Sequence, residues 1–313
     1  MRPFRSARRR AARRADVPAL VLAALLAGCS SPPAEAPPPA EVADPPRFRV
    51  GTEEPGAAMN FGRETDPVQL FVQLDRQLRN ARDPASNVLV VRNIAPVLAR
   101  YVDANVDLIL AALDGDNERH RLVAAWALGY AGDPQVTRRL LGLLADPSPK
   151  VRANALHALS LRRDPATPLA PLLAGFADDD AGVRCNAARA VREVLAPGTG
   201  TEAIVPLTGL VRDEDPMVRL AAVGALGRIA RPECLGYLVG ALSDKTPLVR
   251  TQAALALGKS SDPAAVSHLL AALRSETNPL ALDALVKALE ILTGQQLRSR
   301  DEWLEWGKRA RSR

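Results

Sequence analysis

The chain is poor in the residue types that most often carry chemistry. Its 313 residues include three histidines and three cysteines, and aromatic residues make up 4%. So few aromatic rings argue against the stacking platforms that bind single-stranded nucleic acids. No Cys-x-x-Cys or His-x-x-x-His spacing of a metal site occurs, and no P-loop, Gly-x-Ser-x-Gly or glycine-rich dinucleotide motif is present. We therefore expect no metal, no cofactor and no catalytic residue.

The excess of positive charge is confined to the first 28 residues. The whole chain has 41 basic and 35 acidic residues, a formal charge of +6. Residues 1–28 contain seven arginines and a single acidic residue, Asp16, so the remainder has 34 residues of each sign. A neutral chain gives no electrostatic reason to expect a nucleic-acid partner.

The N-terminal pattern is that of an export signal. The arginines precede an apolar run over 19–26, which is far shorter than the roughly 20 residues that a bilayer span needs. The run ends in Leu26-Ala27-Gly28-Cys29, which resembles the signal of a bacterial lipoprotein; an ordinary signal peptide is the alternative. The resemblance implies cleavage before Cys29, lipidation of Cys29 and attachment to a membrane. Because serines rather than Asp follow Cys29, it also implies the outer membrane, facing the periplasm.

Five regions follow from composition. Prolines crowd the stretch after Cys29, which predicts an extended tether without a core. Beyond it, Val68, Leu70, Phe71, Leu74 and Leu78 predict an amphipathic capping helix. The predicted regions are the signal peptide (1–28), the tether (29–60), the N-terminal capping helix (61–84), helical repeats (85–295), and a C-terminal capping helix with a tail (296–313).

One arginine recurs through the repeat region at nearly constant spacing. Its copies lie 31, 32, 35 and 31 residues apart, and a periodicity of this length indicates stacked units rather than one globular core. Each copy opens an Ala- and Leu-rich segment that predicts a first helix, followed by a shorter apolar segment that predicts a second. Gly129, Gly227 and Gly258 are expected just past the ends of first helices. The recurring arginines are Arg121, Arg152, Arg184, Arg219 and Arg250.

The Val-Arg, Ala-Ala and Leu-Gly positions, with an Asp six residues before the arginine, resemble HEAT repeats. They are most similar to the short bacterial type seen in phycobilin lyases. The resemblance implies an all-α solenoid of about six to seven helical hairpins with terminal caps, and it implies little about function because one solenoid serves many tasks.

The arginine column allows two interpretations. Stacked arginines could form an anion-binding strip, or each could pair with an aspartate of an inter-helix turn in its own or the next repeat. The matching column of aspartates favours pairing, because the guanidinium fork fits a carboxylate. We also expect the arginines outside the column, such as Arg162 and Arg228, to lie on solvated helix surface. The aspartates, which suit a helix start, are Asp146, Asp178, Asp213 and Asp244.

Two smaller features also carry alternatives. Trp303 and Trp306 are three residues apart and share a helix face. They could form an aromatic ligand site or a cap over the open end of the stack, and we favour the cap. Cys185 and Cys234 could form a disulfide after export, but two such distant cysteines are more simply small buried apolar residues.

Three functions fit these features. The first is a membrane-anchored, non-catalytic scaffold or adaptor that offers a long surface to an envelope protein or peptide. The second is a helical-repeat enzyme such as a lyase, which requires a chromophore or metal in the purified protein. The third is a passive spacer, which would tolerate surface mutations but not the loss of repeats. We favour the scaffold.

Overall fold

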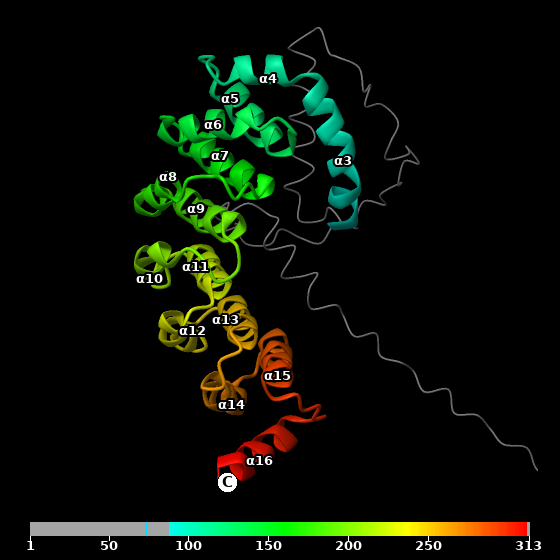
Figure 1. The fold of residues 1–313 in the computed structure, drawn as a ribbon, viewed down its shortest axis with the longest axis vertical. Helices are drawn as coiled ribbons and strands as arrows, with labels where there is room; N and C mark the ends of the chain where they lie inside the picture. The colour runs from blue at the N-terminus through cyan, green and yellow to red at the C-terminus, as the bar shows by residue number, and fades with distance from the viewer. Residues whose placement is uncertain (1–72, 74–87, 312–313) are drawn as a thin grey trace, which may run out of the picture.

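The computed structural model describes residue 73 and residues 88–311, and these residues contain helices and no strand. Figure 1 shows the helices stacked pair after pair into an elongated column. The predicted all-α solenoid is therefore confirmed. The signal peptide, the tether, Cys29 and nearly all of the predicted N-terminal capping helix lie outside the described residues. No helix in the described part is long and apolar enough to cross a bilayer.

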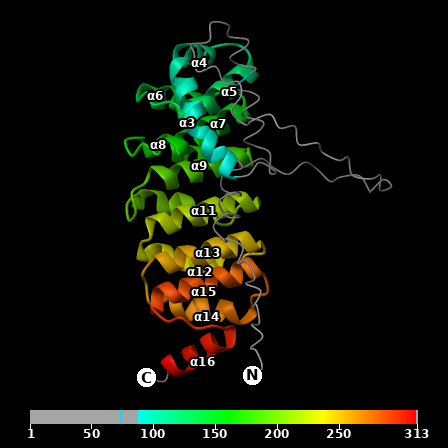
Figure 2. The same cartoon turned by 90° about the vertical axis from the view of Figure 1, so that its right-hand side faces the viewer.

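The column has two layers that alternate along the chain, and Figures 1 and 2 show them from two sides. Helices α3 and α4 precede five long–short pairs, and α15 and α16 follow them. The first layer, which we call the long-helix face, comprises α5 (Glu118–Ala127), α7 (Pro149–Arg162), α9 (Ala181–Val194), α11 (Pro216–Ile229), α13 (Pro247–Lys259) and α15 (Pro279–Thr293). The second comprises α6 (Gln135–Gly142), α8 (Leu169–Ala174), α10 (Ile204–Leu210), α12 (Leu235–Ala241) and α14 (Ala265–Ser275). The flanking helices are α3 (Val88–Ala104), α4 (Val106–Ala112) and α16 (Arg300–Arg311).

Local sequence sets where the long helices begin. Four of them, α7, α11, α13 and α15, start with a proline, whose fixed φ and missing N–H suit the first helical position. Asp180, Asp215 and Asn278 cap three long helices by accepting hydrogen bonds from backbone N–H groups of the first turn. The Asp column expected at the helix starts lies two residues before the capping position. Its carboxylates accept the backbone N–H two residues on, as Asp178 does from Asp180 at 3.0 Å.

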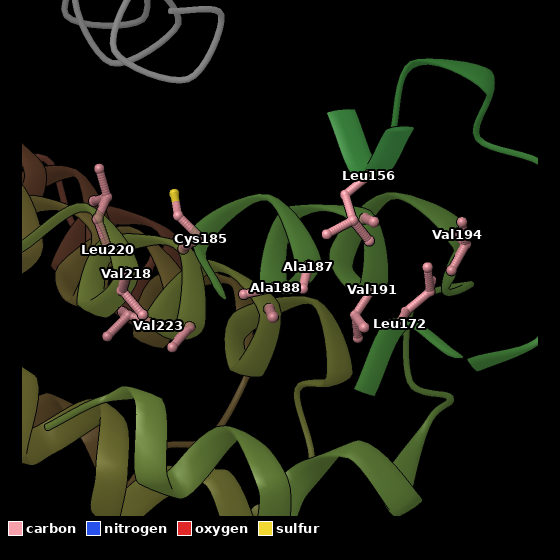
Figure 3. Packing of buried hydrophobic residues seen from close by; sticks show 14 of the residues in the cluster. Leu156, Leu172, Cys185, Ala187, Ala188, Val191, Val194, Val218, Leu220 and Val223 are labelled. Carbon is pink, nitrogen blue, oxygen red and sulfur yellow. The ribbon is translucent and has the colours of Figure 1, made fainter. Parts of the chain in front are cut away.

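The long helices pack closely because small residues lie between them. Figure 3 shows Ala187, Ala188 and Val191 of α9 near Leu172 of α8 and Val218 of α11. All five side chains are buried. The buried residues of the whole column form one continuous cluster, so each pair of helices depends on its neighbours for its core.

The position expected for the repeat glycines is right for Gly129, which lies two residues past the end of α5, and wrong for the other two. Gly227 and Gly258 lie inside α11 and α13 rather than past their ends. A Cβ at Gly258 would lie 2.8 Å from the Cα of Ala288, and one at Gly227 would lie 2.5 Å from the Cβ of Ala256. These glycines therefore allow one long helix to touch the next, and they do not terminate a helix.

The C-terminal helix α16 packs against α14 at the end of the column. Trp303 is fully buried and meets Trp306 edge to face, with ring centroids 5.8 Å apart. A Cβ at Gly307 would lie 2.6 Å from Leu270 of α14, so the two helices approach closely there. This placement supports a cap over the end of the stack.

Candidate functional site

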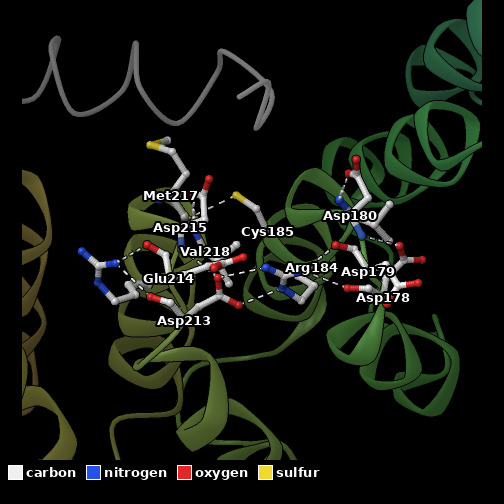
Figure 4. Close-up of polar contacts among 12 residues, drawn as sticks. Asp178, Asp179, Asp180, Arg184, Cys185, Asp213, Glu214, Asp215, Met217 and Val218 are labelled. Atoms are coloured by element: carbon white, nitrogen blue, oxygen red, sulfur yellow. Dashed lines mark hydrogen bonds and ion pairs between the residues drawn. The ribbon is translucent and has the colours of Figure 1, made fainter. Parts of the chain in front are cut away.

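Each arginine of the column joins two consecutive inter-helix turns. Arg152 donates from Nε and Nη2 to the carboxylate of Asp178, at 2.7 and 2.9 Å. Its Nη1 donates to the carbonyl oxygens of Asp146 and Pro147, at 2.9 and 3.2 Å. Figure 4 shows the same arrangement one repeat on, where Arg184 binds Asp213 and the carbonyls of Asp178 and Asp179.

This arrangement repeats along the column without interruption. Each of the five arginines of the column forms an ion pair with the acidic residue of the following turn rather than with the aspartate of its own turn. All three guanidinium nitrogens are engaged each time, so the geometry supports a structural ladder rather than an anion-binding strip. The five ion pairs, hereafter the arginine ladder, are Arg121–Asp146, Arg152–Asp178, Arg184–Asp213, Arg219–Asp244 and Arg250–Glu276.

The last partner of the arginine ladder, Glu276, is absent from the predicted aspartate column. It lies 26 residues after Arg250, and Asp178 lies the same distance after Arg152. This spacing is the signal that identifies it. Glu276 also accepts the backbone N–H of Asn278 at 2.8 Å, so its longer side chain replaces the aspartate in both roles.

The ladder also lowers the pKa values of Asp178, Asp213, Asp244 and Glu276. Burial alone would raise the pKa of Asp178, but hydrogen bonds from Arg152 and the backbone of Asp180 outweigh it and lower that pKa. The hydrogen bonds from Arg250 lower the pKa of Glu276 to about 2. These acids stay ionised in the folded protein at neutral pH.

Two further arginines are structural, contrary to the prediction that they lie on solvated surface. Arg162 of α7 donates to the carbonyl oxygens of Ala131 and Asp133, at 2.5 and 2.7 Å, in the preceding turn. Arg228 of α11 donates from Nε to the carbonyl of Leu195 at 3.0 Å. Arg228 thus satisfies the C-cap carbonyl of α9, and Arg162 satisfies carbonyl groups of the turn that follows α5.

The repeat built on α9 departs from the others. Arg192 occupies the position eight residues after the ladder arginine, where Gly129, Gly227 and Gly258 lie in sister repeats. Its guanidinium crosses onto α11 at Gly224, where a Cβ would lie only 3.2 Å from Nη1. At this interface the glycine therefore lies on α11 instead of α9, and α9 has an arginine at the position where sister repeats have the glycine.

Arg192 shares its carboxylate partner with a second arginine. It donates from Nη2 and Nε to Oε1 of Glu193, at 2.6 and 2.9 Å. Arg163, the left-handed residue that ends α7, lies with its Nε 3.0 Å from Oε2 of the same carboxylate. Both oxygens of Glu193 are therefore already occupied by cations.

Arg189 completes this group, and it is the most unusual charge in the described part of the chain. Its side chain is buried, with 6% of the residue exposed, yet Nε and Nη1 have no hydrogen-bond acceptor there. Burial and the nearby charge of Arg192 lower its pKa to about 10, while Glu193 acts in the opposite direction. At neutral pH it remains protonated. We call Arg163, Arg189, Arg192 and Glu193 the cationic cluster; it carries two net positive charges.

The cluster faces away from the short helices. Cys185, Arg189, Arg192 and Glu193 recur at helical spacing along one side of α9. Figure 3 shows Cys185 pointing away from Leu172 of α8. The cationic cluster therefore belongs to the long-helix face.

Sequence reasoning missed Arg189 although a signal was present. It lies five residues after its ladder arginine, in an alanine-rich helix. None of the other four repeats with a ladder arginine has a charged residue there, so a comparison of these repeats would have singled it out. The residues at this position in the other four repeats are Trp126, His157, Gly224 and Leu255.

The remaining candidates are the two cysteines of the repeats and a possible metal site. Cys234 is a free, buried cysteine, so it does not pair with Cys185. Cys185 is also buried, and its Sγ donates to the carbonyl oxygen of Met217 at 3.4 Å. Among the described residues, no three His, Cys, Asp or Glu side chains gather where they could hold a metal ion.

Comparison with known proteins agrees with this architecture. YibA of Escherichia coli is 23% identical, with a TM-score of 0.50, over 73% of this chain and 86% of that one. A HEAT-like repeat protein of the archaeon Thermococcus onnurineus NA1 is 14% identical, with a TM-score of 0.46, over 77% and 99%. A designed armadillo repeat protein is 22% identical, with a TM-score of 0.44, over 59% and 98%. No curated protein matches the chain.

A family model decides the assignment. The model for HEAT repeats matches residues 106–192 and 204–290, which together are more than half of the chain. These segments contain every arginine of the ladder and the three arginines of the cationic cluster, and Glu193 follows the end of the first segment. The chain belongs to the HEAT-repeat proteins.

Proposed function

We propose that this protein is a lipid-anchored, non-catalytic scaffold of the bacterial cell envelope that binds another envelope protein or peptide along its long-helix face. The observation that carries the proposal is the division of labour among its arginines. The arginines of the ladder donate hydrogen bonds that hold consecutive turns together. The cationic cluster, in contrast, places two net positive charges on the long-helix face.

The rigidity of the column supports a recognition role. Each ladder arginine bridges neighbouring repeats, so their relative orientation is fixed before any partner arrives. A preformed surface loses less conformational entropy on binding than one that must first be ordered. Solenoids in general offer extended binding surfaces of this kind.

The anchor is proposed from the sequence Leu26-Ala27-Gly28-Cys29, with the proline-rich stretch as the tether. We expect metabolic labelling with a palmitate analogue to mark the wild-type protein in the bacterial cell. We expect the Cys29→Ala variant to remain unlabelled and to leave the outer-membrane fraction. A Cys29 peptide that is unmodified, or that is joined to another cysteine, would contradict the anchor.

Cross-linking in living cells tests the scaffold. A photo-reactive amino acid placed at Gln252, on the long-helix face beside Gly224, should yield a specific cross-linked protein identifiable by mass spectrometry. The same probe at Val205, on the exposed side of α10, is the matched control. The charge reversal Arg192→Glu should reduce the cross-link. A passive spacer would show no specific adduct at either position, and this result would end the scaffold proposal.

A further inference from the structure

We propose that the cationic cluster is a binding site for a side-chain carboxylate of an acidic peptide segment, with Arg189 as the principal ligand-binding residue. This inference rests on the proposed scaffold function and names the chemistry of its partner. Its basis is a buried arginine whose Nε and Nη1 have no acceptor in the described structure.

The other buried arginines show how this fold treats a guanidinium that serves only the structure. Arg219 is about as buried as Arg189, and it donates to one carboxylate, one hydroxyl and two carbonyl oxygens. Arg162, which is half-buried, is likewise held by two carbonyl oxygens of the preceding turn and by the Thr137 hydroxyl. Arg189 has no such set of partners, so a structural role does not account for its charge.

Leaving Arg189 unpaired is costly to the folded protein. A buried donor without an acceptor loses its hydration and gains nothing in return, and the loss is larger when the group is charged. Arg192 adds repulsion. Glu193 compensates only in part, because its single negative charge is shared with Arg192 and Arg163. An arriving anion would therefore meet unused donors and a surplus of positive charge.

The burial of Arg189 selects the kind of anion. Only 6% of the residue is exposed, so a flat membrane surface cannot reach its guanidinium. A glutamate or aspartate side chain is slender and ends in a planar carboxylate, which matches the guanidinium fork.

The position of the cluster agrees with a recognition role. It lies at the repeat that breaks the regular pattern, where the ladder arginines are 35 residues apart instead of 31 or 32 and Arg192 replaces the packing glycine. Departures from local regularity are expected at functional sites, because the other repeats show that the fold does not need them.

The test measures binding of a fluorescein-labelled peptide of alternating glutamate and glycine to the full-length chain in detergent. We expect saturable binding that weakens with salt, and no binding of the same peptide with glutamine in place of glutamate. Arg189→Met should weaken binding about tenfold or more, the loss typical of a charge-assisted hydrogen bond. Arg189→Lys, which keeps the charge but not the fork, should bind more weakly than wild type. The control Arg138→Met removes an exposed arginine of α6 and should leave binding unchanged.

A thermal unfolding curve of each variant keeps the test interpretable. Arg189→Met should melt at a higher temperature than wild type, because it removes an uncompensated buried charge. A lower melting temperature would mean that Arg189 has structural partners, and it would overturn the proposal. Equal peptide affinity in wild type and Arg189→Met would also overturn it, as would binding to phosphatidylglycerol vesicles with none to the peptide.

The outcomes separate this inference from the scaffold function. If cells yield a specific cross-linked partner but the acidic peptide does not bind, the carboxylate site is wrong and the scaffold stands. If the peptide binds through Arg189 but no partner is captured in cells, the site stands and the scaffold is wrong.

Discussion

Replacing Arg219 with alanine tests whether the arginine ladder holds the column together. Arg219 donates to the Asp244 carboxylate at 2.7 and 3.0 Å and to the carbonyl oxygens of Asp213 and Glu214 at 2.9 and 3.0 Å. The side chains of Arg219 and Asp244 are 6% and 11% exposed, so water does little to replace these bonds. Removing one partner of such a buried pair costs about 3 to 5 kcal/mol, because the other charge stays buried alone.

The assay is urea unfolding followed by circular dichroism, with the free energy of unfolding extrapolated to water. Arg139→Ala is the matched control, since Arg139 pairs with Asp114 at 2.6 Å but the two side chains are 42% and 71% exposed. Such a surface pair contributes about 1 kcal/mol or less. A double-mutant cycle with Asp244→Ala should return a coupling energy near the upper end of about 0.5 to 3 kcal/mol.

The solenoid adds a spatial expectation to this prediction. Because each repeat is stabilised by its neighbours, the loss in Arg219→Ala should appear first as faster amide exchange in α11 and α13. If Arg219→Ala loses no more stability than Arg139→Ala, or if exchange rises equally in every helix, the ladder does not carry the inter-repeat coupling and the reasoning fails.

Two further substitutions test the acid and glycine contacts. Glu276→Gln should be less stable than wild type at neutral pH, and the gap should close as the pH falls. Arg250 lowers the folded pKa of Glu276 from 4.5 to about 2, so its contribution is complete above pH 4.5 and disappears as the pH nears 2; acid titration of both proteins by circular dichroism checks this, and a pH-independent gap would contradict it. Gly258→Ala should cost about 1 to 3 kcal/mol, because its Cβ would press on the backbone of Ala288. Gly236→Ala has no atom within 4 Å of the new Cβ and should be neutral or stabilise by up to about 1 kcal/mol; similar melting curves for the two variants would refute the close-packing account.

Much of the ladder could be anticipated from the sequence. Recurrence of an arginine with an aspartate at a fixed offset identifies partners, because stacked repeats bring equivalent residues to equivalent places. The offset does not say which of two turns supplies the carboxylate, and both were open until the structure placed Asp178 rather than Asp146 against Nε of Arg152. Glu276 was not predicted as a partner because the expected column was defined as a set of aspartates, by residue type and not by position.

The glycines and Arg189 show why the rest could not be read in advance. A glycine after an alanine-rich run fits a helix end as well as it fits a contact between helices, and only the neighbouring helix distinguishes the two at Gly227 and Gly258. The missing acceptors of Arg189 are likewise a property of its surroundings, since they depend on which side chains of α7 and α11 reach α9.

The sequence by itself determined the repeat period, the helical character and the starts of the long helices. These features arise from side chains that act over one or two turns, such as prolines at the first helical position, Asp and Asn caps, and alanine-rich faces. The tertiary structure alone decided how one repeat meets the next: the carboxylate chosen by each ladder arginine, the helix contacts made at glycine, and the charge left unpaired at Arg189. These depend on packing between segments some thirty residues apart, which no local pattern specifies.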